Sequence, residues 1–204
     1  MHPSPLRSLV VLTLVLALAG CSSTTLVSQW QNPQAVPARF ERLLVIGVSQ
    51  RPGLRRTFED TFVARLKAEG VDAVPSYFVI PEDGQVPEAR LQEAVQRASA
   101  DGVLITQLVR VERQTEVSPG YYAPAPVGFG FYPWYSAAWV GYYEPPRVYH
   151  YDVYISETSL YDVRRNHLVW SGIVQTRAPR DLDKAIRRYV DTVIKALRKE
   201  QVLA

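Results

Sequence analysis

Hydrophobic positions recur along the first half of the chain with spacings that predict strands and helices in alternation. Residues 43–48 form a continuous apolar run, as expected for a strand covered on both faces. Apolar residues then recur every four positions from Leu54 to Leu66, which predicts one face of a helix. Pro52 suits the first turn of this helix, and Gly70 supplies its end.

The middle of the chain continues this alternation. Residues 72–80 predict a second strand, and a second, shorter amphipathic helix is marked by Leu91, Ala94, Val95 and Ala98. Residues 102–117 predict a third strand, which is fully apolar at 103–105 and then alternates with polar residues. This change of pattern indicates a strand that leaves the covered sheet and becomes half exposed.

The C-terminal part predicts a hairpin and a last helix. Residues 149–163 and 168–176 read as two strands around a polar turn at 164–166, hence an antiparallel hairpin. A helix is expected from about Asp181, with acidic residues at its start and basic residues near its end, as the helix dipole favours. Its apolar face comprises Leu182, Ile186, Tyr189, Val190, Val193 and Leu197.

The predicted order of elements is β-α-β-α-β-β-β-α. Two crossover connections followed by antiparallel strands predict a mixed sheet of about five strands with helices packed on it. The fold class is therefore α/β, of the α+β kind, in a single globular domain over residues 39–204.

Two pairs of opposite charges on the first helix are spaced for contact. Arg55 with Glu59, and Arg56 with Asp60, lie four residues apart. Such pairs stabilise a helix by a few tenths of a kcal/mol. We interpret them as a solvated helix face and not as a site.

The N-terminus has the features of a targeting segment. Residues 1–20 contain Arg7 and then an apolar run at 9–19, which is too short to span a bilayer and suits the core of a signal peptide. The run ends in Leu18-Ala19-Gly20-Cys21, and this tetrapeptide resembles the bacterial lipobox. The resemblance implies cleavage between Gly20 and Cys21, with lipidation of Cys21.

The lipobox resemblance also implies a location. Residue 22 is Ser and not Asp, which by similarity to the sorting rule of enteric bacteria favours the outer membrane. Residues 21–38 are rich in Ser, Thr, Gln and Pro and predict a lipidated tether before the domain. We expect the domain to face the periplasm.

Composition excludes several classes of protein. The net charge of +3 is too small and too evenly spread for a nucleic-acid-binding protein. Cys21 is the only cysteine, so a lipidated chain would have neither a disulfide nor a thiol nucleophile. Burial alone must then stabilise the domain.

The element order, placed behind a lipobox, is similar to the periplasmic domain of curli-secretion lipoproteins and of the lipoprotein activators of penicillin-binding proteins. It also resembles the N-terminal domain of the Tol–Pal propeller protein. Four segments resemble a group of uncharacterised proteobacterial lipoproteins, namely residues 58–62, 73–77, 160–162 and 168–171. These resemblances imply no catalytic residues, and a fold does not fix a function.

Catalytic and metal-binding motifs are not evident. The sequence has no G-x-S-x-G nucleophile elbow. After signal cleavage only His150 and His167 remain, and neither has a second ligand at metal-binding spacing. We therefore expect no metal, no cofactor and no enzymatic activity.

The most unusual segment is an insertion at residues 119–146. Its 28 residues include six Tyr, two Phe, two Trp, six Pro and four Gly, and Glu144 is its only charge. Three interpretations stay open: a low-complexity excursion between two strands, a protein-docking surface, or rings that stack on sugars or lie in the lipid interface. The candidate surface comprises Tyr121, Tyr122, Phe129, Phe131, Tyr132, Trp134, Tyr135, Trp139, Tyr142 and Tyr143.

These features favour a non-enzymatic outer-membrane lipoprotein that acts as a protein-interaction or assembly factor. Its expected partners are the membrane, through the lipid on Cys21, and either another envelope protein or a second copy. The alternative is a module that binds peptidoglycan or another glycan through the aromatic insertion.

Overall fold

The computed structural model describes residues 24–34, 40–82, 84–122, 132, 135, 143–178 and 181–203. The predicted signal peptide, its cleavage site and Cys21 lie outside these residues. The elements in chain order are β1 (Thr24–Gln31), β2 (Arg42–Val48), α2 (Pro52–Ala68), β3 (Asp72–Pro75), the 3-10 turn η1 (Ser76–Phe78), α3 (Glu88–Ala98), β4 (Gly102–Ser118), β5 (Tyr121–Tyr122), β6 (Tyr143–Glu144), β7 (Arg147–Asp162), β8 (His167–Arg177) and α5 (Leu182–Lys199).

Six strands form one mixed sheet in the order β1-β8-β7-β4-β2-β3. Strand β2 pairs in parallel with β3 and β4, whereas the other neighbours pair antiparallel. A second, two-stranded sheet joins β5 to β6. The predicted α+β class with a mixed sheet is confirmed, and β1 adds a sixth strand to the five expected.

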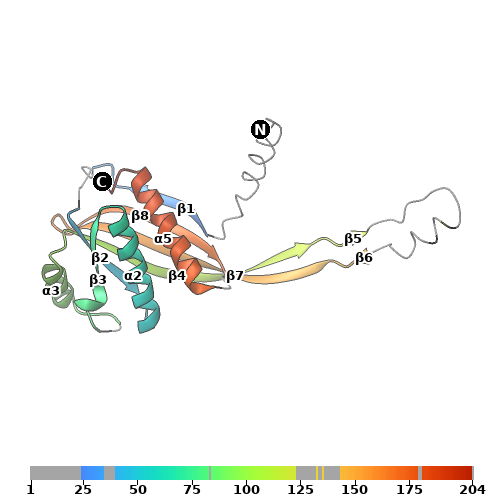
Figure 1. Ribbon diagram of the computed structural model, residues 1–204, viewed down its shortest axis with the longest axis horizontal. Helices are drawn as coiled ribbons and strands as arrows, with labels where there is room; N and C mark the ends of the chain where they lie inside the picture. The colour runs from blue at the N-terminus through green and yellow to red at the C-terminus, as the bar shows by residue number, and fades with distance from the viewer. Residues whose placement is uncertain are drawn as a thin grey trace, which may run out of the picture.

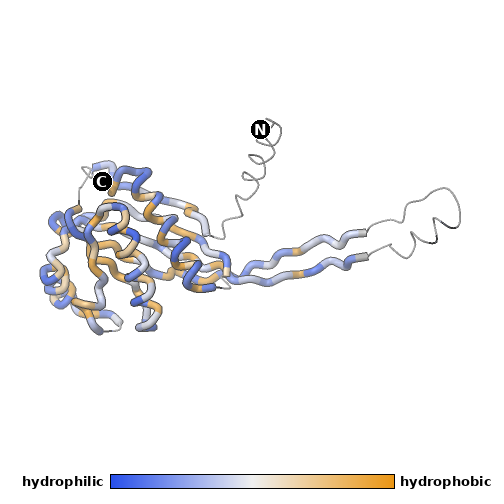
Figure 2. Tube along the Cα trace, viewed as in Figure 1, coloured by the Kyte–Doolittle hydropathy of each residue, from blue (hydrophilic) through white to orange (hydrophobic). Residues whose placement is uncertain are grey.

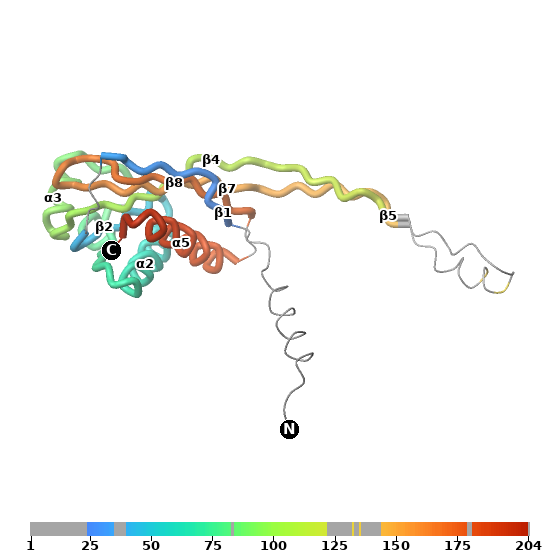
Figure 3. Tube along the Cα trace, turned by 90° about the horizontal axis from the view of Figure 1, so that it is seen from above, coloured from blue at the N-terminus to red at the C-terminus, as the bar shows by residue number. Residues whose placement is uncertain are grey.

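Helices cover both faces of the sheet. Alternate residues of β2 point to opposite faces, so Leu43 packs in the main core with α2 and α5, whereas Leu44 packs with Ala98 of α3. Figures 1 and 3 show α2 and α5 side by side on one face, with α3 at the far end of the domain. The main core includes Phe62, Trp170 and Leu197, all of them fully buried.

Two predicted segments differ in the structure. The predicted tether is wrong for residues 24–31, which form β1 along the edge of β8. The predicted strand over 72–80 ends at Pro75, and the chain then turns through η1. Proline has no N–H to donate to a ladder, so pairing with β2 stops there.

The remaining predicted elements are found. Gly70 follows α2 with φ of 84°, a conformation that glycine adopts without strain. Asp181 caps α5 by accepting a hydrogen bond from the Lys184 N–H. Leu182 departs from the predicted apolar face, because it is exposed in the first turn of α5.

Strands β4 and β7 continue far beyond the sheet. Figure 1 shows them leaving the domain as a two-stranded ribbon that leads to β5 and β6. We call residues 113–118 and 147–152, together with β5 and β6, the arm. Figure 2 shows hydrophobic residues gathered in the domain, whereas the arm is mostly hydrophilic with isolated hydrophobic positions.

Tyr189 of α5 makes the stability of the fold depend on pH in the alkaline range. Its hydroxyl lies 2.7 Å from Thr158 Oγ1, and burial raises the pKa of Tyr189 to about 12. The unfolded chain ionises this group near pH 10, so stability is full below pH 10 and is lost as pH rises towards 12. Between pH 9 and 11 the free energy of unfolding should fall by about 1 kcal/mol more in the native chain than in Tyr189→Phe. Urea unfolding at both pH values measures this, and an equal fall in both proteins would contradict it.

Candidate functional site

The arm begins where the neighbouring strands end. Strand β2 stops at Val48, opposite Gln107 of β4, and β8 stops at Arg177, opposite Val153 of β7. Beyond these residues β4 and β7 pair only with each other, through Ser118 and Arg147. The six residue pairs from Arg113–Asp152 outward extend about 20 Å at the usual rise per residue.

Cross-strand side chains hold the arm together. Arg113 pairs with Asp152 at 3.3 Å, and the Tyr151 hydroxyl donates to Gln114 Oε1 at 3.0 Å. At the root of the arm, the Arg177 guanidinium lies 3.6 Å from the centre of the Tyr151 ring and also pairs with Glu116. These contacts stabilise the arm without a hydrophobic core, because none of the described arm residues is buried.

One face of the arm carries exposed valines. Directly paired residues of a ladder share a face, so Val117 and Val148 lie side by side. Their exposed fractions are 60% and 57%. The same face carries Val111, which is also exposed, nearer the domain.

The aromatic candidates divide into three groups. Tyr121, Tyr132 and Tyr135 are described and exposed, with exposed fractions of 64%, 82% and 50%. Tyr122 and Tyr143 are partners in the β5–β6 ladder. The other five lie outside the described residues: Phe129, Phe131, Trp134, Trp139 and Tyr142.

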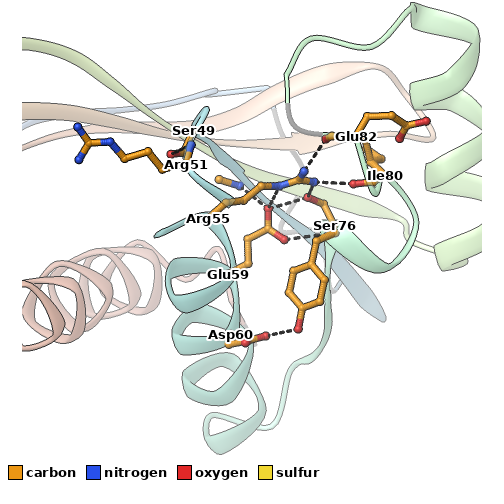
Figure 4. A network of polar contacts seen from close by, with 10 residues as sticks. Ser49, Arg51, Arg55, Glu59, Asp60, Ser76, Ile80 and Glu82 are labelled. Carbon is orange, nitrogen blue, oxygen red and sulfur yellow. Dashed lines mark hydrogen bonds and ion pairs between the residues drawn. The ribbon is translucent and has the colours of Figure 1, made fainter. Parts of the chain in front are cut away.

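The charged pair Arg55–Glu59 is buried, so its interpretation as a solvated face is wrong. Glu59 is fully buried and Arg55 is 5% exposed, with 3.0 Å between Arg55 Nε and Glu59 Oε1. Figure 4 shows the pair between α2, the end of β2 and the turn after β3. The second pair, Arg56–Asp60, is on the exposed side, where Asp60 accepts a hydrogen bond from the Tyr77 hydroxyl at 2.7 Å.

Both oxygens of the Glu59 carboxylate accept hydrogen bonds. Oε1 accepts from the backbone N–H of Gly47 at 2.9 Å and from the Ser76 hydroxyl at 2.7 Å, and Oε2 accepts from the N–H of Tyr77 at 3.1 Å. The Arg55 guanidinium also donates to the carbonyls of Ile80 and Glu82. A buried ion pair whose two carboxylate oxygens are both hydrogen-bonded within the fold indicates a structural clamp.

The sequence carried a signal for this clamp. Apolar positions spaced four apart drift by about 40° per step on a helix of 3.6 residues per turn. Counting back from Leu66 and Phe62 with the true helical period places Glu59 and Arg55, and not Phe58 and Leu54, on the buried stripe. Gly47 is a further sign, because a side chain there would meet Phe58 at 3.3 Å.

Other candidate chemistry is sparse in the described part of the chain. It has no group of three or more His, Cys, Asp or Glu residues placed to hold a metal ion. His150 contacts Thr115 Oγ1 at 3.0 Å within the arm, and His167 begins β8. Among the described helices, none has the length and apolar character needed to cross a membrane.

Comparisons with known proteins show similar folds at low identity. No family model matches the chain. No curated protein matches it either. The solved structures that match it include two that align with most of the chain at low identity. The PelC dodecamer from Paraburkholderia phytofirmans is 16% identical, with a TM-score of 0.45, over 85% of this chain and 96% of that one. Lipoprotein GNA1162 from Neisseria meningitidis is 11% identical, with a TM-score of 0.41, over 78% and 98%.

Proposed function

We propose that this chain is a non-enzymatic, lipid-anchored protein of the outer membrane whose arm docks another envelope protein. The observation that carries the proposal is the arm itself, which extends about 20 Å beyond the sheet and adds nothing to the buried core. A two-stranded hairpin is marginally stable by itself in water. Its retention outside the core is therefore better explained by a role than by folding.

The arm has two properties that suit docking. Val111, Val117 and Val148 expose apolar area on one face, and such area gains free energy when a partner covers it. Both strands of the arm are also edges, with backbone N–H and C=O groups that can pair with an added strand. The partner that fits is a protein that offers an extended segment and an apolar side.

The anchor part of the proposal rests on the lipobox resemblance at Leu18-Ala19-Gly20-Cys21, and the outer membrane on Ser22. Two or more acyl chains hold a protein stably on a bilayer. The domain would then stay close to the membrane surface.

Site-specific photo-crosslinking in intact cells tests docking through the arm. A photoreactive amino acid at Val117 or Val148 should form adducts with another envelope protein, because both side chains are exposed on one face. The matched control is Gln96, which is exposed on α3 at the opposite end of the domain. Adducts at Gln96 equal to those at Val117 and Val148, or none at the arm, would contradict the proposal.

A further inference from the structure

The chain enters the sheet beside the root of the arm. Thr24, the first residue of β1, pairs with Thr176 of β8, and Thr176 pairs with Tyr154 of β7. The first residues of the arm, Asp152 and Arg113, come just beyond this row. Figure 1 shows the same arrangement, with the start of β1 at the end of the domain from which the arm leaves.

Cys21 can therefore lie only a short way from the arm. Two residues separate it from Thr24, so three steps along the chain, at no more than about 3.3–3.6 Å each, limit the distance from Cys21 to Thr24 to about 11 Å. The predicted tether of residues 21–38 would have allowed a much larger distance, but β1 takes eight of its 18 residues into the sheet and begins only three positions after Cys21. A lipid on Cys21 would hold the root of the arm, and not the opposite end with α3, at the bilayer surface.

The outer part of the arm has the chemistry of a membrane interface. From its root to its end, the charged side chains of the arm are paired with opposite charges: Arg113 with Asp152, Glu116 with Arg177, and Arg147 with Glu144 at 2.9 Å. Paired charges lower the cost of approaching a low-dielectric phase.

Three of the described exposed side chains in the segment that follows β4 are tyrosines. Tyr121, Tyr132 and Tyr135 are all at least half exposed, and residues 119–146 contain one charge in 28 residues. Tyrosine is favoured at the boundary between headgroups and acyl chains, because its ring is apolar and its hydroxyl is polar.

We infer that the end of the arm lies in the bilayer interface as a second contact with the membrane. This inference rests on the proposed lipidation of Cys21. One point of attachment leaves a domain free to turn in all directions, whereas two points at least about 20 Å apart restrict it to rotation about the line between them. The ribbon between these points is then held along the membrane surface. Its docking face meets only proteins embedded in that membrane or lying against it.

Fluorescence quenching by lipids tests this arrangement in the lipidated, full-length mature protein. Lipid blocks Cys21, the only cysteine, so an introduced cysteine is the single free thiol. An environment-sensitive dye is attached at Tyr135→Cys, at Tyr132→Cys or at the control Gln96→Cys. Each protein is placed in vesicles of phosphatidylethanolamine and phosphatidylglycerol that contain brominated acyl chains.

We expect a blue shift and a loss of dye emission at positions 135 and 132, and neither at position 96. Emission at the two arm positions equal to that at position 96 would overturn the membrane contact. Flotation of the Gln96→Cys protein with the vesicles reports on the lipid anchor separately. Failure to float would overturn the anchor, and with it the inference. Adducts formed from Val117 in cells would still decide protein docking.

Discussion

Replacing Glu59 by alanine is expected to lower the free energy of unfolding by about 3–5 kcal/mol, because it leaves the buried Arg55 guanidinium without its carboxylate. The Gly47 and Tyr77 N–H groups and the Ser76 hydroxyl would also lose their acceptor. Buried donors without a partner carry the full desolvation penalty. Urea-induced unfolding, followed by circular dichroism, measures the loss.

The matched control is Glu93→Ala. Glu93 pairs with Arg90 at 3.1 Å on the surface of α3, where its side chain is 62% exposed. Exposed ion pairs contribute about 0–1 kcal/mol, so this variant should unfold nearly as the native chain does. A Glu59→Ala loss no larger than that of Glu93→Ala would show that the buried pair does not stabilise the fold.

The clamp explains how the parallel half of the sheet is held. Glu59 is on α2, Gly47 ends the part of β2 that faces α2, and Ser76 and Tyr77 follow β3. One carboxylate therefore ties a helix to the ends of two strands and, through Arg55, to the loop at Ile80 and Glu82. The clamp lies in the parallel half of the sheet, whereas the arm leaves from the antiparallel pair β4–β7. The clamp therefore accounts for stability, and the proposed docking belongs to the arm.

The sequence predicted the elements whose pattern reflects burial on one side. Helix α5 and the β7–β8 hairpin were found with small shifts of their ends. The alternation after residue 105 predicted a strand that leaves the covered sheet, and β4 does so, since all its residues beyond Thr106 are at least partly exposed. The pairing of β7 with this extension became visible only in the structure.

Strand β1 could not be predicted from its pattern. It pairs only with β8, and most of its residues are exposed, so no face of it needs a regular apolar period. Polar edge strands of this kind resemble linkers in composition.

The turn η1 was missed for the opposite reason. Residues 76–80 are mostly apolar, as in a strand. However, the pairing of β3 with β2 ends at Pro75, and the Ser76 hydroxyl is hydrogen-bonded to Glu59 and Arg55.

Excising the outer arm should remove the interactions of the protein and leave its fold intact. Residues 115–150 can be replaced by Asn-Gly, which joins Gln114 directly to Tyr151. This register suits a two-residue turn. The Asp152 carbonyl accepts from Ala178 N–H and so faces β8, which makes the next pair outward, Gln114–Tyr151, a hydrogen-bonded pair. The change keeps the contact of Arg177 with Tyr151.

Stability should change by no more than about 1 kcal/mol, because no described residue between 107 and 152 is buried. The variant keeps Cys21 and the whole domain, so its membrane fractionation should match that of the native chain. Loss of partners would then come from the arm alone, and not from misfolding or misplacement.

The direct measurement is chemical crosslinking in intact cells, followed by identification of the adducts of the native and the excised protein. We expect the native protein to form adducts with another protein that is embedded in the membrane or lies against it. The excised protein, equally abundant and equally membrane-bound, should form none. An unchanged set of adducts after excision would contradict the role of the arm as the docking surface.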